Sequence, residues 1–299
     1  MRAAVIYNPS AGRGRAGVIA SAVERGLVKR GLEAELFATQ RPTDAMDIAG
    51  RLVSQVDVIV AVGGDGTINE VVNGMTRRRR QRPNAQPRAK LGIVPAGTVN
   101  VLALDLGLPF QVERACNVIA GGRTVFIDVG GVNKRGFVLM MGAGVDALTV
   151  ANIDPRTKKR FRELAFLGTG LKVGLATPPP AFVVRTGGRE YTATFFVASN
   201  SRYYAGHLGL TPEADLTDGV LDLLVFTGTT RSSLATFWLE VPSRLHLRNS
   251  NVIYLRGEQA ELIPLEDKET IWFQTDGELA GKLPATVEID AHALEVLVP

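Results

Sequence analysis

The segment Val62-Gly63-Gly64-Asp65-Gly66-Thr67-Ile68-Asn69-Glu70 decides the fold class of this 299-residue chain. It follows an apolar run typical of a buried strand, and the residues after it have the pattern of a helix. Glycines let backbone amides approach a ligand, and a helix N-terminus favours phosphate. A carboxylate at Asp65 beside phosphates suits Mg²⁺. The segment therefore predicts a phosphate-binding turn, with Thr67 and Glu70 as a capping box that starts the helix at Thr67.

Two further loops have the same character. Asn8-Pro9-Ser10-Ala11-Gly12-Arg13-Gly14 follows an expected strand at 3–7, and Pro95-Ala96-Gly97-Thr98-Val99-Asn100 follows another at 91–94, with Thr98 as the expected N-cap. Each loop joins the end of a strand to the start of a helix. Because the carboxyl ends of parallel strands meet at one edge of a sheet, we expect the three loops to lie together.

The patterns around these loops predict two domains. Up to residue 129, strand-like and helix-like stretches alternate, among them a helix at 44–52, which indicates an α/β domain with a mainly parallel sheet. From residue 130 to 289 short strand-like runs prevail, which indicates a mainly antiparallel β domain. We expect its strands at 137–141, 181–186, 192–199, 221–226, 252–255, 270–274 and 287–289, and its helices at 158–173 and 232–239. No long linker separates the halves, so a cleft between packed domains is expected.

Composition narrows the cellular setting. A single cysteine, Cys116, allows no internal disulfide, which fits a reducing compartment. No apolar run reaches the roughly 18 residues of a membrane helix, and the N-terminal MRAAVIYNPS has no signal-peptide core. The hydrophobic fraction of 45% is ample for buried cores. We expect a cytoplasmic protein.

The positive charge is concentrated in one segment. Seven cations and no acid lie between Thr76 and Lys90, namely Arg77, Arg78, Arg79, Arg80, Arg82, Arg88 and Lys90. Because the net charge of the whole chain is +4, the remainder is slightly acidic. Such a run is either a solvated loop or a contact for an anionic membrane surface. It has no interleaved aromatics, so it gives no support for nucleic-acid binding.

Other phosphate-binding and catalytic motifs fit less well. Gly12 to Gly17 matches G-x-G-x-x-G, but four residues separate it from Tyr7, whereas the dinucleotide fingerprint turns directly off the strand. No P-loop and no G-x-S-x-G motif occurs. The three histidines, His207, His246 and His292, do not have metal-ligand spacing.

Five motifs together resemble the diacylglycerol kinase catalytic-domain family of soluble bacterial lipid kinases, which is related to sphingosine and ceramide kinases. They are Asn8-Pro9-x-x-Gly12, Gly63-Gly64-Asp65-Gly66-Thr67-x-Asn69-Glu70, Pro95-x-Gly97-Thr98-x-Asn100, Asp215-x-x-Asp218-Gly219 and Asp276-Gly277-Glu278. Gly-Gly-Asp-Gly alone also occurs in NAD kinases and phosphofructokinases, but the order of all five is specific. The chain has Val101 where bacterial members often have an aspartate, so it lacks one polar contact near the nucleotide that the resemblance would imply.

The resemblance implies a fold and a set of roles. The fold is an NAD kinase- or phosphofructokinase-like α/β domain over 1–129, to which residues 290–299 return, and a β-sandwich over 130–289 that takes the lipid acceptor. ATP would be bound by Asn8, Ser10, Gly12, Thr39, Gly63, Gly64, Asp65, Gly66, Thr67, Asn69 and Thr98. Glu278 would be the general base, and Asp65 and Asp128 would act around the catalytic Mg²⁺. A second, structural Mg²⁺ would be held by Asp215, Asp218 and the carbonyl of Val220.

The residues alone leave several of these roles open. Glu278 follows an Asp-Gly pair, which either aims a carboxylate into a cleft or makes an exposed hairpin turn. Asp215 and Asp218 suit an oxygen-ligated cation, but they also suit a polar turn. Asp128 could simply precede the Gly130-Gly131 turn. The apolar and basic residues of 158–173 fit a core-packed helix or a segment at a membrane surface.

The expected function is transfer of the γ-phosphate of ATP to a lipid hydroxyl, such as that of diacylglycerol, in phospholipid metabolism. A peripheral contact with an anionic membrane would bring the enzyme to its substrate. The alternatives are a kinase for NAD or another soluble alcohol, and a lipid- or nucleotide-binding protein without turnover. The acceptor lipid and the oligomeric state, including a homodimer, stay open.

Overall fold

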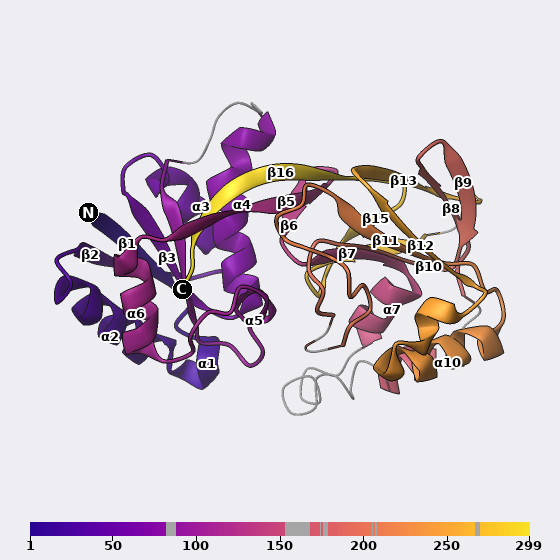
Figure 1. Ribbon diagram of the computed structural model, residues 1–299, viewed down its shortest axis with the longest axis horizontal. Helices are drawn as coiled ribbons and strands as arrows, with labels where there is room; N and C mark the ends of the chain where they lie inside the picture. Colours follow the sequence, from indigo (N-terminus) through magenta and orange to yellow (C-terminus); the bar gives the residue numbers. More distant parts are fainter. Residues whose placement is uncertain are drawn as a thin grey trace. The chain divides into compact units, whose positions relative to one another are not determined.

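Four parallel strands carry the three N-terminal loops. In the computed structural model they are β1 (Arg2–Tyr7), β2 (Glu33–Ala38), β3 (Val58–Gly63) and β4 (Lys90–Pro95), arranged in the order β2-β1-β3-β4 (Figure 1). Every residue of β3 is buried, as expected for a strand covered on both faces. The structure describes residues 1–81, 88–152, 168–173, 175, 179–204, 206, 208–266 and 270–299.

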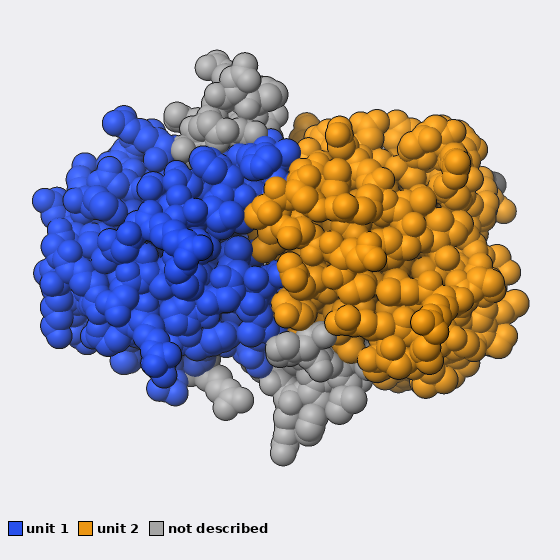
Figure 2. Space-filling view, in the orientation of Figure 1, with its two compact units in different colours: residues 1–129, 290–299 blue, residues 130–289 orange. Residues whose placement is uncertain are grey.

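The chain divides into two compact units, one of residues 1–129 with 290–299 and the other of residues 130–289 (Figure 2). We call them unit 1 and unit 2. Two strands pass from one unit to the other, β5 (Thr124–Val132) and β16 (Ala285–Leu297). In unit 1 the end of β16 pairs in parallel with β4, where Val296 lies opposite Leu91.

Helices cover both faces of the unit 1 sheet. They are α1 (Ala11–Gly14), α2 (Ala16–Val28), α3 (Asp44–Leu52), α4 (Asp65–Gln81), α5 (Val101–Asp105) and α6 (Val112–Gly121). One core joins α2 and α6 to Val58, Val60 and Val62 of β3. The alternate residues Ile59 and Ala61 point to the other face, where α3 and α4 pack together.

Unit 2 is a sandwich of two antiparallel layers. One layer has the order β12-β11-β10-β7-β14-β15, and in the other β16 pairs with β13, which continues to β8 and β9. A single core takes side chains from both layers, among them Phe196 and Phe273 from the first and Phe182 and Leu262 from the second. The strands are β6 (Arg135–Phe137), β7 (Met140–Gly144), β8 (Phe182–Thr186), β9 (Arg189–Ala193), β10 (Phe195–Ser199), β11 (Leu221–Phe226), β12 (Val252–Gly257), β13 (Gln259–Pro264), β14 (Trp272–Thr275) and β15 (Glu278–Lys282).

These two architectures confirm the predicted fold class, a mainly parallel α/β part followed by an antiparallel β-sandwich. Unit 2 also contains α7 (Val145–Asn152), α10 (Arg231–Glu240) and the 3-10 turns η1 (Val241–Ser243) and η2 (Leu245–Arg248). Of the helix predicted at 158–173, residues 168–173 are helical and the rest lie outside the described residues. Among the described helices, none combines the length and apolar composition that a membrane crossing requires.

Five local expectations were wrong. Helix α4 begins at Asp65 rather than Thr67, so Thr67 and Glu70 do not form a capping box. Helix α5 begins at Val101, and its N-cap residue is Asn100 instead of Thr98.

The other three concern lengths of elements. Helix α4 continues to Gln81, so Arg77–Arg80 are helical and not part of a loop; residues 82–87 lie outside the described part. The strand expected at 137–141 is divided between the end of β6 and the start of β7. The strand expected at 192–199 is also two strands, because at Thr194 the chain passes from one layer of the sandwich to the other. There the Thr194 hydroxyl donates to the carbonyl of Gly228 at 2.8 Å.

Candidate active site

The three glycine loops begin at one edge of the unit 1 sheet. Tyr7 at the end of β1 lies opposite Val62 of β3, and Gly63 lies opposite Pro95 at the end of β4. The pairing continues into the loops, since the amide of Ala96 donates to the carbonyl of Gly63 at 2.8 Å. The carboxyl ends of these strands are therefore level, which is the place where open α/β sheets bind ligands.

Glycines allow the loops to touch. A Cβ on Gly64 would lie 3.2 Å from the Cα of Gly97, and a Cβ on Gly97 would collide with the Cα of Gly64. Gly12 has a φ of +59°, and a Cβ on it would lie 2.7 Å from the carbonyl oxygen of Ala96. Backbone thus packs on backbone between all three loops, as the sequence led us to expect.

The first loop is ordered by its own asparagine. The carboxamide oxygen of Asn8 accepts the amide of Ser10 at 2.9 Å, and the carbonyl of Asn8 accepts the amide of Ala11 at 2.9 Å. Thr39 follows β2, and its amide donates to the carbonyl of Tyr7 at 2.9 Å. Asn8, Ser10, Gly12 and Thr39 therefore stand at the same sheet edge as the second loop.

The second loop turns directly into α4. Asp65 is the first residue of the helix and is half-buried, whereas Gly66 is exposed. Thr67 and Asn69 are buried, and a Cβ on Gly63 would lie 2.6 Å from the hydroxyl oxygen of Thr67. The amides of the first turn of α4 point toward the sheet edge, and their partial positive charge favours an anion there.

Glu70 has a different task from the one expected. Its two carboxylate oxygens accept the amides of Thr43 at 3.1 Å and Ala45 at 3.2 Å, at the start of α3. Because α4 begins at Asp65, Glu70 lies more than one turn inside that helix and caps its neighbour. The Asn-Glu part of the motif therefore orders the scaffold behind the loop.

In the third loop Thr98 is exposed and Asn100 is buried. Asn100 has a φ of +58°; its carboxamide accepts the amide of Gly97 at 2.9 Å and donates to the carbonyl of Gly97 at 3.1 Å. This double contact holds Gly97 against Gly64. Thr98 is left at the surface, where it is accessible to a ligand.

Unit 1 has a hollow of about 530 Å³. It runs between the edge strand β2 and helix α3 and contains the ion pair of Arg41 with Asp44, whose atoms are 2.9 Å apart. Backbone and side-chain hydrogen bonds from Gln40 and Arg41 lower the pKa of Asp44. The sequence had suggested none of the residues that line this hollow as site residues. They are Leu36, Phe37, Ala38, Gln40, Arg41, Asp44, Asp47, Ile48 and Arg51.

Asp128 lies inside β5 and is fully buried. One of its carboxylate oxygens accepts the amide of His292 on β16 at 2.6 Å, and His292 has a φ of +52°. Asp128 thus fixes the backbone of the returning strand. A role around a metal ion stays a prediction for this residue.

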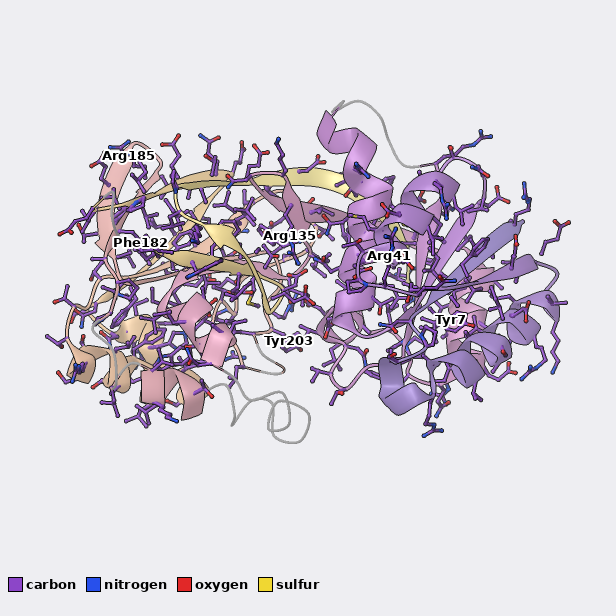
Figure 3. All side chains as sticks on the ribbon, turned by 180° about the vertical axis from the view of Figure 1, so that it is seen from behind. Tyr7, Arg41, Arg135, Phe182, Arg185 and Tyr203 are labelled. Carbon is purple, nitrogen blue, oxygen red and sulfur yellow. The ribbon has the colours of Figure 1, made fainter. Side chains whose placement is uncertain are left out.

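Glu278 begins β15 in the hairpin that follows β14. Asp276 and Gly277 form the turn of this hairpin, with φ values of +49° and +83°. A type I′ hairpin turn requires positive φ at both of its central residues. The Glu278 side chain is 65% exposed, and its carboxylate lies 3.0 Å from the guanidinium of Arg135, which is labelled in Figure 3. The Asp-Gly pair therefore makes an exposed hairpin turn, and this turn also presents the carboxylate of Glu278 at the surface.

The neighbour Asp276 anchors this hairpin. Its carboxylate accepts the backbone amides of Val138 at 2.9 Å, Leu139 at 2.9 Å and Met140 at 3.0 Å. These three amides span the connection from β6 into the start of β7. The Asp-Gly-Glu motif therefore combines a structural aspartate, a turn glycine and an accessible glutamate.

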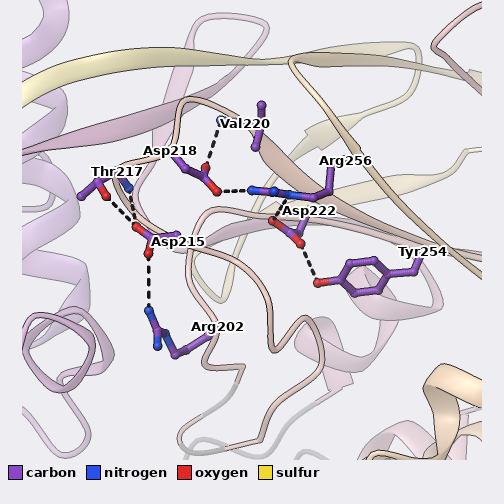
Figure 4. A network of polar contacts seen from close by, with 8 residues as sticks. All are labelled: Arg202, Asp215, Thr217, Asp218, Val220, Asp222, Tyr254 and Arg256. Carbon is purple, nitrogen blue, oxygen red and sulfur yellow. Dashed lines mark hydrogen bonds and ion pairs between the residues drawn. The ribbon is translucent and has the colours of Figure 1, made fainter.

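The turn with Asp215 and Asp218 is closed by arginines (Figure 4). Asp215 accepts the amide and hydroxyl of Thr217 at 2.9 and 2.7 Å, and its other oxygen lies 3.8 Å from Arg202. Asp218 accepts the amide of Val220 at 3.2 Å and pairs with Arg256.

Each carboxylate oxygen of this turn thus has a partner within the protein. Among the described residues, no group of three or more His, Cys, Asp or Glu side chains is arranged to hold a metal ion. The arrangement does not fit a cation unless an arginine moves away, and the metal role of Asp215, Asp218 and Val220 stays a prediction. Arg256 also lies 3.6 Å from the buried Asp222, whose pKa is raised by burial.

Comparison with known proteins identifies the family. Residues 2–132 match the family described as "Diacylglycerol kinase catalytic domain", and residues 140–298 match the "YegS C-terminal NAD kinase beta sandwich-like domain". A protein named diacylglycerol kinase from Staphylococcus epidermidis is 30% identical over 307 residues, covering 100% of this chain and 92% of that protein. Its namesake from Staphylococcus haemolyticus is 30% identical over 300 residues, covering 99% and 88%.

Solved structures share the fold. A putative diacylglycerol kinase from Bacillus anthracis superposes with a TM-score of 0.82 at 23% identity, covering 100% of this chain and 95% of that one. Such similarity concerns the fold alone. The fold and the sequence relatives together define a phosphotransferase of the kinase type. The chain belongs to the diacylglycerol kinase catalytic-domain family, as its motifs predicted.

Proposed function

We propose that this protein is an ATP-dependent lipid kinase that transfers the γ-phosphate of ATP to a lipid hydroxyl, with diacylglycerol as the first acceptor to test. The observation that carries the proposal is the backbone packing of the loops at Gly12, Gly64 and Gly97 at the carboxyl edge of the unit 1 sheet. In a chain of this family, such a cluster of glycine loops beside a helix N-terminus suits a polyphosphate.

In this proposal unit 1 holds the nucleotide. Backbone amides of residues 63–67 bind phosphate oxygens, and Asn8, Ser10, Thr39 and Thr98 contact the rest of the nucleotide. Mg²⁺ held by Asp65 and the phosphates of ATP would neutralise charge on the transferred group. Asp65 fits this task because its carboxylate stands in the first turn of α4, beside the exposed Gly66. A role of Asp128 around the same Mg²⁺ is part of this proposal.

In unit 2 we assign the acceptor and the base. Glu278 would take the proton of the lipid hydroxyl, since its carboxylate is accessible and stands on a rigid hairpin. Its partner Arg135, 3.0 Å away, would hold the carboxylate in position. Hydrogen bonding and positioning of this kind account for most of the protein's contribution to phosphoryl transfer.

We also propose a cytoplasmic enzyme that meets an anionic membrane peripherally. The support is the run of cations from Arg77, each of which is worth about 1 kcal/mol near such a surface. Vesicle sedimentation with anionic and with neutral lipid tests this part by itself.

The central test is transfer of radiolabelled γ-phosphate from ATP into extracted lipids and into purified diacylglycerol. Asp65→Asn and Glu278→Gln are each expected to lower transfer about 100-fold, as the loss of a positioned acid–base or charge-bearing group does. Glu190→Gln is the matched control for Glu278, because Glu190 is also an exposed unit 2 glutamate, 61% accessible, paired with an arginine at 2.6 Å. That arginine, Arg185, is labelled in Figure 3.

Glu113→Gln is the control for Asp65, because both acids stand in the first turn of a unit 1 helix and Glu113 lies outside the hollow. Wild-type transfer by Asp65→Asn and Glu278→Gln would refute the roles given to them. NAD is a necessary second acceptor, since the match of residues 140–298 is to a domain described as NAD kinase-like. Phosphorylation of NAD in place of any lipid would favour the soluble-alcohol kinase, and nucleotide binding without any product would favour a silent binding protein.

A further inference from the structure

A buried polar chain in unit 2 leads to the hairpin of Glu278. It starts at Asp146 on α7, whose side chain is fully buried. One carboxylate oxygen accepts the hydroxyl of Tyr204, and the other accepts the carboxamide nitrogen of Gln274 on β14 at 2.8 Å. The carboxamide oxygen of Gln274 then accepts the amide of Gly277 at 2.7 Å. Gly277 is the residue directly before Glu278.

The chain fixes the direction of the Gln274 carboxamide. Because a carboxylate only accepts, the nitrogen of Gln274 must face Asp146, and the oxygen must then face Gly277. Gln274 is 1% exposed and stands where the register of β14 and β15 shifts, so the strand itself turns this side chain toward the turn.

Gly142 of β7 leaves space for the side chains of Asp146 and Gln274. A Cβ on Gly142 of β7 would collide with the Asp146 carboxylate and would lie 2.9 Å from the carboxamide nitrogen of Gln274. Burial raises the pKa of Asp146 to about 6, although the hydrogen bonds from Tyr204 and Gln274 oppose this rise. Burial of a carboxylate costs free energy, so packing alone does not explain an aspartate at this position.

We propose that Asp146 and Gln274 are positioning residues that hold the Asp276–Gly277 turn, and through it set the direction of the Glu278 carboxylate. This inference rests on the role of Glu278 in the proposed function. Asp276 holds the turn from the β6–β7 connection, and Gln274 holds it from the inside of unit 2. With both contacts, Gly277 has one backbone orientation, and the first residue of β15 follows from it.

The test exchanges the two side-chain types. Gln274→Glu alone places a second carboxylate against Asp146, and Asp146→Asn alone offers an amide to a glutamine. In the double variant, the amide nitrogen introduced at position 146 can donate to the carboxylate introduced at position 274, and the amide oxygen can accept from Tyr204. The second oxygen of the new carboxylate can accept from Gly277. Every hydrogen bond of the chain is then possible again with one carboxylate, as in the wild type.

We expect Gln274→Glu and Gln274→Leu to lower kcat about 10- to 100-fold, the range that a misplaced catalytic group gives, with the KM for ATP changed less than about 2-fold. The double variant should regain kcat to within about 5-fold of the wild type, as a coupled pair does. Opening of the hairpin at the Gly277 amide, followed by hydrogen–deuterium exchange, should be faster in the single variants and slow again in the double variant.

Thr194→Val is the control for lost buried hydrogen bonding. It removes a buried unit 2 contact to the carbonyl of Gly228 and should lower the melting temperature without lowering kcat. If the Gln274 variants likewise lower the melting temperature and leave kcat unchanged, the buried polar chain is only structural and the inference is wrong.

Glu278→Gln is measured in parallel to separate the two proposals. If Glu278→Gln keeps the wild-type kcat, the role of Glu278 fails and the positioning role fails with it. If Glu278→Gln is inactive while Gln274→Leu keeps kcat and slow exchange at Gly277, only the positioning role fails.

Discussion

Gly64 and Gly97 pack backbone against backbone where β3 and β4 end, with only 3.2 Å between a Cβ placed on Gly64 and the Cα of Gly97. The two glycines belong to motifs that lie more than thirty residues apart in the sequence. Their contact makes one surface out of two loops, and Asn100 locks it by its double hydrogen bond to Gly97. Spacing between the loops is therefore set by the absence of two side chains.

Gly97→Ala is expected to separate these loops. The added methyl would collide with Gly64 and lie 2.8 Å from the carboxamide oxygen of Asn100, so we expect a loss of about 1–3 kcal/mol in the free energy of unfolding. Binding of ATP, measured by calorimetry, should weaken about 10-fold or more, since misplaced amides no longer meet the phosphates. Gly121→Ala is the control, because a Cβ at Gly121 meets nothing within 4 Å. Equal effects of both variants would contradict the role of the loop contact.

Glu70→Ala is expected to weaken the start of α3. Its carboxylate is the acceptor for the amides of Thr43 and Ala45, and loss of a helix cap costs about 1–2 kcal/mol. Urea unfolding should show this loss, while Glu70→Gln should keep roughly half of the stabilisation through its remaining oxygen. ATP affinity should change little in either variant. A drop in affinity larger than the drop in stability would mean that Glu70 contacts the nucleotide.

The stability of the protein should depend on pH through Asp146. Its pKa is about 6 in the folded protein, above the ordinary value of 3.8. A raised pKa means that the folded state holds the proton more tightly, so this stabilisation is complete below about pH 4 and is lost as the pH rises through about 6. The difference corresponds to about 3 kcal/mol. The free energy of unfolding of Asp146→Asn should therefore gain on the wild type as the pH rises from about 4 to about 6. A constant difference across this range would show that Asp146 does not titrate there.

Arg256→Met should reveal what the guanidinium does at the Asp215–Asp218 turn. It leaves Asp218 and the buried Asp222 without their cation, which should cost about 1–2 kcal/mol because one of the two partners is buried. Arg185→Met is the control, since its partner Glu190 is exposed and such pairs are worth about 0–1 kcal/mol. Urea unfolding of both variants measures the two losses, and equal losses would mean that the buried Asp222 does not depend on Arg256.

Addition of Mg²⁺ distinguishes a cation site at the Asp215–Asp218 turn from a turn that is closed by arginines alone. Without nucleotide, Mg²⁺ should leave the melting temperature of the wild type unchanged, because the arginines already pair with the carboxylates. In Arg256→Met it should restore part of the lost stability. A clear stabilisation of the wild type by Mg²⁺ would instead support the cation assignment of Asp215, Asp218 and Val220.

The sequence was sufficient for the fold class because its signals were periodic. Helix α3 and strand β11 have the bounds predicted for them, since an amphipathic helix and a continuous apolar run are local patterns. The clustering of the three loops followed from topology, as parallel strands end at one edge. Strands β13 and β15 were not predicted. In β13 the polar and apolar residues alternate over only four positions, 259–262, and in β15 they do not alternate.

The site was harder to predict where side chains act at a distance. Glu70 and Asn100 were in the motifs, but the helix starts that decide their partners differ from the expected ones by two or three residues. Asp146, Gln274, Arg135 and Arg256 were missed because their partners are far away in the sequence. Gln274 did give one sign, a polar residue in a short apolar strand, and such a residue must have a buried partner.

Strand β16 has a consequence for how the protein is made. Its final residues, among them Leu294, Val296 and Leu297, are buried in unit 1, while residues 130–289 form unit 2. A ribosome therefore releases all of unit 2 before it delivers the strand that pairs with β4. Until then unit 1 has an open sheet edge at β4, and a nascent or truncated chain with that edge exposed is prone to pair with the wrong strand.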